Sequence, residues 1–190
     1  KPSDINEHLE TLSNYASMCN SIFETGVRGV VSSWALLHGL SKNNSDSKTF
    51  VMNDIDLINT SSIIKVMDRI NISGEFIQGN NLDLDLNKNF DLVFIDTLHV
   101  YGQLKRELEK YSKIAKKYII LHDTTVDADK GEVIRLGLDI KTIVKQTNFE
   151  EAEIVTGLWP AVDEFLNLNK DWFLHKRYVN NNGLTILQKD

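Results

Sequence analysis

The sequence predicts an α/β fold, in which a mostly parallel sheet carries helices on both faces and ends in an antiparallel hairpin. One observation is that short, continuously apolar runs alternate with longer segments of helical periodicity. Strands that are buried on both faces and joined by crossover helices have this pattern. The other observation is that WFLHKRYV and GLTILQK flank NNNG near the C-terminus, which is a hairpin signal.

Five strands are predicted before the hairpin, at residues 21–25, 49–54, 74–79, 91–96 and 117–123. Helices are predicted at residues 31–39, 60–70 and 101–115. GLWPAVDEF is typical of a loop that enters a helix, with Pro160 near the start of that helix. Residues 126–158 connect the fifth strand to this helix with more chain than a crossover needs, so we expect a lid or specificity insert that is partly mobile without acceptor. Within it, Arg135 and Lys141 are candidate acceptor contacts.

Composition indicates one domain over residues 1–190 that binds neither nucleic acid nor a membrane. The hydrophobic content is 42% and the net charge is -6, which does not suit binding to a phosphate backbone. No apolar run approaches the ~18 residues that a membrane span needs. A single cysteine, Cys19, cannot form an internal disulfide, so we expect it in the core of a cytoplasmic protein. Trp34 is also expected in the core.

Glycines and polar residues follow the first three predicted strands, where open parallel sheets bind their ligands. They are Glu24, Gly26 and Gly29 after the first strand, Asp54 and Asp56 after the second, and Asn80 and Asn81 after the third. Glycines let a ligand approach the main chain, an acid can accept hydrogen bonds from a ribose diol, and amides can pair with an adenine edge. The G-x-G-x-x-G pattern of a pyrophosphate site is missing from ETGVRGV, which disfavours a nicotinamide-dependent oxidoreductase. A ligand with an adenosine half and a cationic sulfonium, such as S-adenosylmethionine, would tolerate Glu24 and Asp96.

A family resemblance supports the same ligand. FETGVRGVVSSWALL, VMNDID, FIQGNN, DLVFIDTLHVYGQLKREL and YIILHDTT resemble class I S-adenosylmethionine-dependent methyltransferases. The resemblance is to the small metal-assisted sugar O-methyltransferases of the rhamnosyl, macrolide-sugar and cephalosporin-cluster type. It covers residues 20–125 and implies a Rossmann-like, mostly parallel, seven-stranded sheet. The sequence departs from these relatives at Val30, where they often have glycine, and at Asn80, where they usually have aspartate.

The resemblance also implies which residues hold the cofactor. Glu24, Gly26 and Gly29 would lie at its methionine part, Asp54 at its ribose, and Asn80 and Asn81 at its adenine, with Asp96 beside it. The richness in Asn and Lys, and a start without methionine, are similar to the methyltransferase domain of a multidomain chlorovirus glycosyltransferase. They predict one domain of a larger chain, in the host cytoplasm if the source is viral.

The predicted catalytic residues follow the fourth and fifth strands, in IDTLH and LHDTT. By resemblance, Asp96 and Asp123 would bind a divalent metal and His99 would act as the base. His122 stands where relatives often have Glu or Asp, and we include it as a metal ligand. Two carboxylates suit Mg²⁺, whereas an added imidazole favours Mn²⁺.

A sugar hydroxyl is too weak an acid to ionise at neutral pH, so its methylation needs a base, a metal or both. We therefore expect a methyltransferase that acts on a sugar hydroxyl, such as that of a rhamnose-type deoxyhexose in a glycan. Two alternatives stay open at this point. One is an O-methyltransferase for catechols or other small phenols. The other is a catalytically silent methyltransferase-like binding module.

Overall fold

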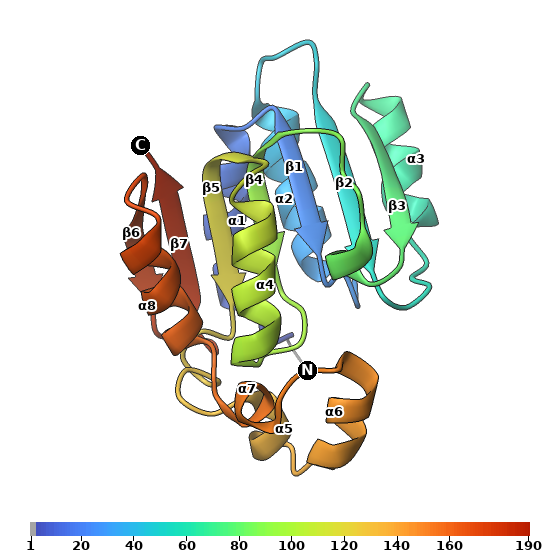
Figure 1. Cartoon of the computed structure of the whole chain (residues 1–190). Helices are drawn as coiled ribbons and strands as arrows, with labels where there is room; N and C mark the ends of the chain where they lie inside the picture. Colours follow the sequence, from blue (N-terminus) through green and yellow to red (C-terminus); the bar gives the residue numbers. More distant parts are fainter. Residues whose placement is uncertain (1–2) are drawn as a thin grey trace.

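A seven-stranded sheet with the strand order β3-β2-β1-β4-β5-β7-β6 forms the centre of the computed structural model, which describes residues 3–190 (Figure 1). Its strands are β1 (Ser21–Thr25), β2 (Thr49–Asp54), β3 (Ser73–Gln78), β4 (Phe90–Ile95), β5 (Ala115–His122), β6 (Trp172–Tyr178) and β7 (Leu184–Lys189). β1 to β5 pair in parallel, and β7 pairs antiparallel with both β5 and β6. The predicted mixed sheet with a C-terminal edge hairpin is confirmed.

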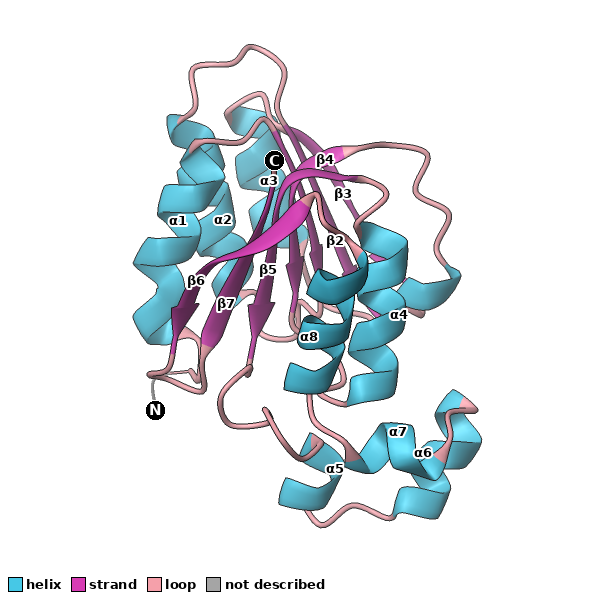
Figure 2. Ribbon diagram, turned by 60° about the vertical axis from the view of Figure 1, so that its left-hand side comes forward, coloured by secondary structure: helices cyan, strands magenta, loops and turns pink. Residues whose placement is uncertain are grey.

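Helices form a layer on each face of this sheet. α1, α2 and α3 cover one face and α4 and α8 cover the other, while α5, α6 and α7 lie beyond the carboxyl ends of the parallel strands (Figure 2). The helices are α1 (Leu9–Ser17), α2 (Val31–Lys42), α3 (Ser61–Arg69), α4 (Tyr101–Tyr111), α5 (Glu132–Arg135), α6 (Ile140–Thr147), α7 (Glu151–Val155) and α8 (Trp159–Leu168), with 3-10 turns η1 (Asn6–His8) and η2 (Asn81–Asp83).

The central strands contain continuous apolar runs because both of their faces are buried. In β2, Phe50 and Met52 belong to the core under α1 to α3, whereas Val51 belongs to the core under α4 and α8. This alternation follows from the two-residue period of a strand. It explains why the sequence shows continuous apolar runs rather than alternating ones.

Most predicted elements agree with the structure within one to three residues, and three expectations differ. The helix predicted to reach Ala115 ends at Tyr111, because Ala115 is buried and pairs with Phe90 as the first residue of β5. α1 was not predicted from the sequence. Trp34 is 41% exposed and not in the core, whereas Cys19 is fully buried as expected.

Residues 126–158 contain α5, α6 and α7 and have a small apolar core of their own. Val133, Phe149 and Ile154 pack with Val100, which precedes α4. A bridge between Lys130 and Thr156 closes the base of the segment. Its mobility without acceptor stays a prediction.

The chain order places a topological switch between β1 and β4. From β1 the chain continues to β2 and β3 on one side, and it then returns to β4 on the other side. Loops that leave neighbouring strands in opposite directions open a crevice at their carboxyl ends. Among residues 3–190, no helix is both long and apolar enough to cross a membrane.

Candidate active site

A cavity of about 860 Å³ lies at this switch point. Its walls come from the ends of β1, β2 and β4, from η2 and the first turn of α4, and from α5, α6 and the residues after α6. A volume of this size suits a nucleoside-sized ligand together with a second small molecule. The insert 126–158 therefore contributes to the cavity wall.

The loop after β1 is tightly fitted to β4. Gly26 has φ of +89°, and a Cβ there would lie 1.9 Å from the carbonyl oxygen of Asp96. Glycine is therefore required by the packing of two backbones, and not only by the approach of a ligand. Gly29 lines the cavity and has room for a Cβ, whose nearest neighbour would be Val31 Cγ2 at 3.7 Å. Val30 keeps the left-handed conformation (φ 61°), which is unfavourable for a β-branched residue.

Glu24 lies beneath this loop and does not line the cavity. Its Oε1 accepts a hydrogen bond from Ser32 Oγ at 2.5 Å. Its Oε2 is buried and has no hydrogen-bond partner within residues 3–190. Burial raises the pKa of Glu24 to about 8, although the hydrogen bond from Ser32 acts in the opposite direction. The structure thus places a buried carboxyl with a raised pKa under the predicted cofactor loop.

Asp54 lines the cavity at the end of β2 and is held by two backbone groups. Its Oδ2 accepts from Arg28 N at 2.8 Å, and its Oδ1 accepts from Asp56 N at 3.0 Å. Each carboxylate oxygen has a further lone pair for a ligand donor. Asp54 therefore meets the requirements of the predicted ribose contact.

The two asparagines after β3 also line the cavity, but their side chains differ in environment. Asn80 is exposed and caps η2 by accepting from Leu82 N at 3.1 Å. Asn81 is buried, and its Nδ2 donates to Glu107 Oε1 at 2.5 Å. Asn80 Nδ2 also donates to Asp83 Oδ2 at 3.0 Å, so both side chains make hydrogen bonds within the protein, and Asn80 is the more accessible of the two to a ligand.

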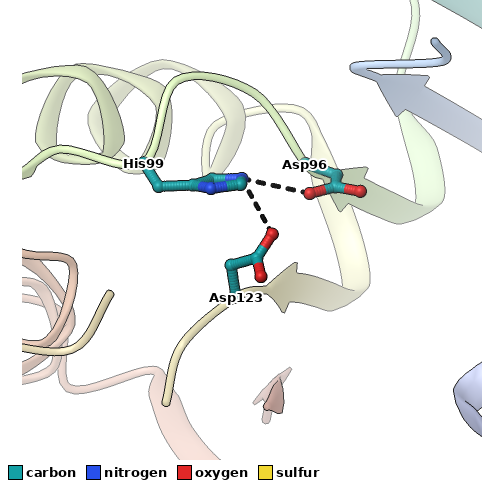
Figure 3. A group of neighbouring side chains, drawn as sticks. All are labelled: Asp96, His99 and Asp123. Carbon is teal, nitrogen blue, oxygen red and sulfur yellow. Dashed lines mark hydrogen bonds and ion pairs between the residues drawn. The ribbon is translucent and has the colours of Figure 1, made fainter. Parts of the chain in front are cut away.

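The residues predicted to be catalytic come together at the ends of β4 and β5 (Figure 3). His99 Nε2 lies 3.1 Å from Asp96 Oδ1 and 3.3 Å from Asp123 Oδ2. His122 Nδ1 contacts the same two oxygens at 3.3 and 3.1 Å. Asp96 and His99 line the cavity, whereas Asp123 and His122 are buried behind them.

Two acids of this site were not predicted from the sequence. Asp127 Oδ2 lies 3.2 Å from His99 Nδ1, and Glu132 Oε2 lies 3.5 Å from the same atom. Asp127 is fully buried and accepts two hydrogen bonds from Arg135, from Nε to Oδ1 at 2.6 Å and from Nη2 to Oδ2 at 2.8 Å. Both acids lie in the long connection after β5, where no strand end marks a site, so the sequence carried no signal for them. Of the two predicted acceptor contacts, Arg135 forms an ion pair with Asp127, and Lys141 is exposed on α6.

The acids and the imidazoles of this cluster shift one another's pKa values. Burial alone would lower the pKa of His99, but hydrogen bonds to Asp127 and Asp96 raise it well above its usual value. Burial likewise opposes protonation of His122, yet Asp123 and Asp96 raise its pKa to about 10. Burial would raise the pKa of Asp96, and hydrogen bonds from His122 and His99 lower it below its usual range. The surrounding acids therefore favour the charged form of both imidazoles.

The same cluster has the composition of a divalent-metal site. Asp96, His99 and Asp123 offer ligand atoms within 4.8 Å of one another, as do His99, Asp127 and Glu132. Asp123 Oδ1 is buried without a hydrogen-bond partner in the described part of the chain. An oxygen-rich set with one imidazole suits Mg²⁺ or Mn²⁺. The residues present therefore fit such an ion. His122 lies next to Asp96 and Asp123, the two aspartates of the first group.

Solved structures of known proteins have a similar fold. No family model matches the chain, and no curated protein sequence matches it either. A Staphylococcus aureus protein described as a caffeoyl-CoA O-methyltransferase is 16% identical with a TM-score of 0.63, covering 97% of this chain and 83% of its own. The O-methyltransferase TomG of Streptomyces achromogenes, solved with S-adenosylmethionine, is 16% identical with a TM-score of 0.61, covering 96% and 79%.

The N-methyltransferase NodS of Bradyrhizobium japonicum is 13% identical with a TM-score of 0.60, covering 98% of this chain and 96% of its own. At this level of identity the likeness concerns the fold, which O- and N-methyltransferases share. The chain therefore has the Rossmann-like fold of class I S-adenosylmethionine-dependent methyltransferases, with the seven-stranded sheet expected from its sequence.

Proposed function

We propose that the protein is an S-adenosylmethionine-dependent O-methyltransferase that acts on a sugar hydroxyl. The observation that carries this proposal is that one cavity joins the Gly26 loop and Asp54 to Asp96 and His99. A methyl donor and an acceptor hydroxyl could thus meet in one enclosed place. The acceptor class, a rhamnose-type deoxyhexose of a glycan, and a viral source rest on the sequence resemblance alone.

The cofactor's sulfonium supplies an electrophilic methyl group, and the chain supplies the groups that orient it. Asp54 is positioned to accept hydrogen bonds from the ribose hydroxyls, and its own position is fixed by Arg28 N and Asp56 N. Gly29 lines the cavity without a side chain, so a ligand could approach the main chain there. Asp96 follows β4, which pairs with β1, and it contacts His99. Its negative charge would favour binding of a sulfonium at this place.

His99 is the group that would take the proton of the acceptor hydroxyl, at Nε2. In that step the hydroxyl oxygen forms its bond to the methyl carbon as the carbon–sulfur bond breaks. His99 must be neutral to accept the proton, whereas the surrounding acids raise its pKa and favour its charged form. A divalent cation held by Asp96 and Asp123 would offset their charge, lower the pKa of His99 and polarise the hydroxyl.

Removal of the Asp54 carboxylate should weaken cofactor binding. Asp54→Ala is expected to reduce the affinity for S-adenosylhomocysteine by about 1.5 to 3 kcal/mol, the range for losing a charge-assisted hydrogen bond. Calorimetry measures this, with Asp68→Ala on the exposed side of α3 as the matched control. Equal affinities for the Asp54 variant and the wild type would remove Asp54 from the ribose contact.

The metal is tested by comparing a chelator with a ligand variant. We expect mass spectrometry to detect methylated rhamnose-containing glycans after incubation with S-adenosylmethionine, and chelation to suppress the product. Asp123→Ala should lower turnover to the level of the chelated wild type and should show little further response to chelator, because both remove the same ion. A wild type that is indifferent to chelator, together with a fully active Asp123→Ala variant, would leave His99 as a base without a metal.

The same assay separates the alternatives. Methylation of catechol with glycans left unmodified would replace the sugar with a small phenol as the acceptor. Cofactor binding with no product from either acceptor class would favour the binding module.

A further inference from the structure

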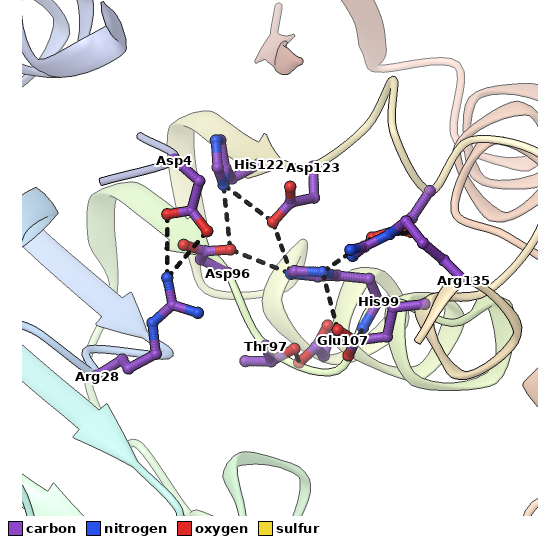
Figure 4. Close-up of polar contacts among 11 residues, drawn as sticks. Asp4, Arg28, Asp96, Thr97, His99, Glu107, His122, Asp123 and Arg135 are labelled. Atoms are coloured by element: carbon purple, nitrogen blue, oxygen red, sulfur yellow. Dashed lines mark hydrogen bonds and ion pairs between the residues drawn. The ribbon is translucent and has the colours of Figure 1, made fainter. Parts of the chain in front are cut away.

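A buried polar network connects three walls of the cavity through one carboxylate. Glu107 on α4 is 1% exposed, and its Oε1 accepts three hydrogen bonds. The donors are Asn81 Nδ2 at 2.5 Å, Thr97 Oγ1 at 2.6 Å and Gln103 Nε2 at 2.8 Å. All three donors line the cavity, from η2, the end of β4 and the first turn of α4. Figure 4 shows Thr97 and Glu107 next to His99.

This network determines the orientation of the Gln103 amide. A carboxylate oxygen accepts hydrogen bonds, so the amide atom of Gln103 that faces Glu107 must be the nitrogen. The same Nε2 also donates to Asn81 Oδ1 at 3.0 Å, which uses both of its hydrogens. No group within residues 3–190 donates to the remaining atom, Gln103 Oε1. A flipped amide would place Oε1 against the Glu107 carboxylate and the Asn81 carbonyl, so the flip is disfavoured.

The surroundings of Gln103 suit a flat, mostly apolar ring. Leu82, Leu98 and Phe149 line the same cavity, and Asn80 lies at the turn where the proposed function places adenine. Gln103 is 8% exposed, so an acceptor at this position is largely shielded from water. A shielded acceptor discriminates strongly between ligand groups that can and cannot donate to it.

We propose that Gln103 selects a 6-aminopurine, because its Oε1 accepts a hydrogen bond from the exocyclic amine. Glu107 is the positioning residue, which holds the Gln103 amide in that orientation. This inference rests on the proposed function, since it assumes that an adenosine occupies the cavity. A 6-oxopurine would present a carbonyl oxygen to Oε1, and two acceptors would then face each other. The amide cannot turn to donate instead while Glu107 is a carboxylate.

The test compares S-adenosylhomocysteine with its inosine analogue by calorimetry, which needs no turnover. The wild type is expected to bind the adenosine compound at least ~10-fold more tightly than the inosine compound. Glu107→Gln preserves the shape but can exchange donor and acceptor, so it should reduce this ratio to less than ~3-fold. Gln103→Leu should reduce it similarly. Gln188→Leu on β7, a Gln→Leu change away from the cavity, should keep the wild-type ratio, with melting curves to verify folding.

The possible outcomes separate this inference from the proposed function. A wild type that binds both compounds equally would overturn the inference and leave the methyl-donor site intact. An equal loss of affinity for both compounds in Glu107→Gln would show that Glu107 has a structural role only, and would overturn its positioning role. A wild type that binds neither compound would overturn the proposed function and this inference with it.

Discussion

Replacement of His99 is expected to reduce methyl transfer by ~10² to 10⁴, the usual cost of losing a general base. His99 lines the cavity next to Asp96 and carries a ring nitrogen that could take a proton from the acceptor hydroxyl. The loss should appear in kcat, while the affinity for S-adenosylhomocysteine changes less than ~3-fold, because the proton moves only in the transition state. Both quantities are measurable on His99→Ala with purified protein.

A structural effect of this substitution can be separated from a catalytic one. His99 contacts Asp96, Asp123, Asp127 and Glu132, so alanine leaves four acids without the imidazole that they share. His99→Gln keeps a polar side chain in place but has no basic nitrogen, and it should be as inactive as alanine. His175→Ala on the exposed strand β6 is the matched control and should retain wild-type turnover. A fully active His99→Gln enzyme would contradict the mechanism.

Glu24 is expected to make the folded protein less stable as pH rises, and Glu24→Gln should remove this effect. The pKa of Glu24 is raised from 4.5 to about 8, so the folded protein keeps a proton that the unfolded chain releases. The contribution of this retained proton to the free energy of unfolding is fully present below about pH 4.5, and it is lost progressively as the pH rises to about 8. At pH 8 the glutamine variant should therefore be more stable than the wild type by roughly 2 to 4 kcal/mol.

Denaturant unfolding of the ligand-free protein at pH 5 and pH 8 measures this difference. At pH 5 the two proteins should differ little, because neutral Glu and Gln have similar shapes and hydrogen-bonding groups. Glu109→Gln on the exposed side of α4 should leave the pH dependence unchanged. A Glu24→Gln variant that is less stable than the wild type at pH 8 would mean that Glu24 is ionised and stabilising in the folded state.

The sequence predicted the sheet well because the strands carry their own signal. Continuous apolar runs that end in polar residues marked β1 to β5, and NNNG marked the hairpin, where Gly183 has φ of +97°. α1 had no comparable signal. It forms because Leu12 and Ala16 pack into the core beside α2, which is a tertiary cause.

The candidate site was predictable where a residue follows a strand. Asp54, Asp96, His99 and Asp123 lie at strand ends and come together at one edge of the sheet, as parallel topology requires. Asp127 reaches His99 only because residues 126–158 fold back over this edge, which no local pattern encodes.

Asn81 and Val30 illustrate two further limits. The direction of the Asn81 amide depends on Glu107, a residue 26 positions along the chain. Val30 stands where similar methyltransferases often have glycine, and it adopts the left-handed conformation that glycine favours, with φ of 61° at the start of α2. A residue type therefore indicates a backbone conformation without determining it.

Calorimetric titration with S-adenosylhomocysteine and with NADH tests the central claim most directly. The claim is that the cavity at the β1–β4 switch point is a methyl-donor site. We expect saturable binding of S-adenosylhomocysteine with one site per chain, and no heat with NADH. Clear binding of NADH without any binding of S-adenosylhomocysteine would contradict the claim.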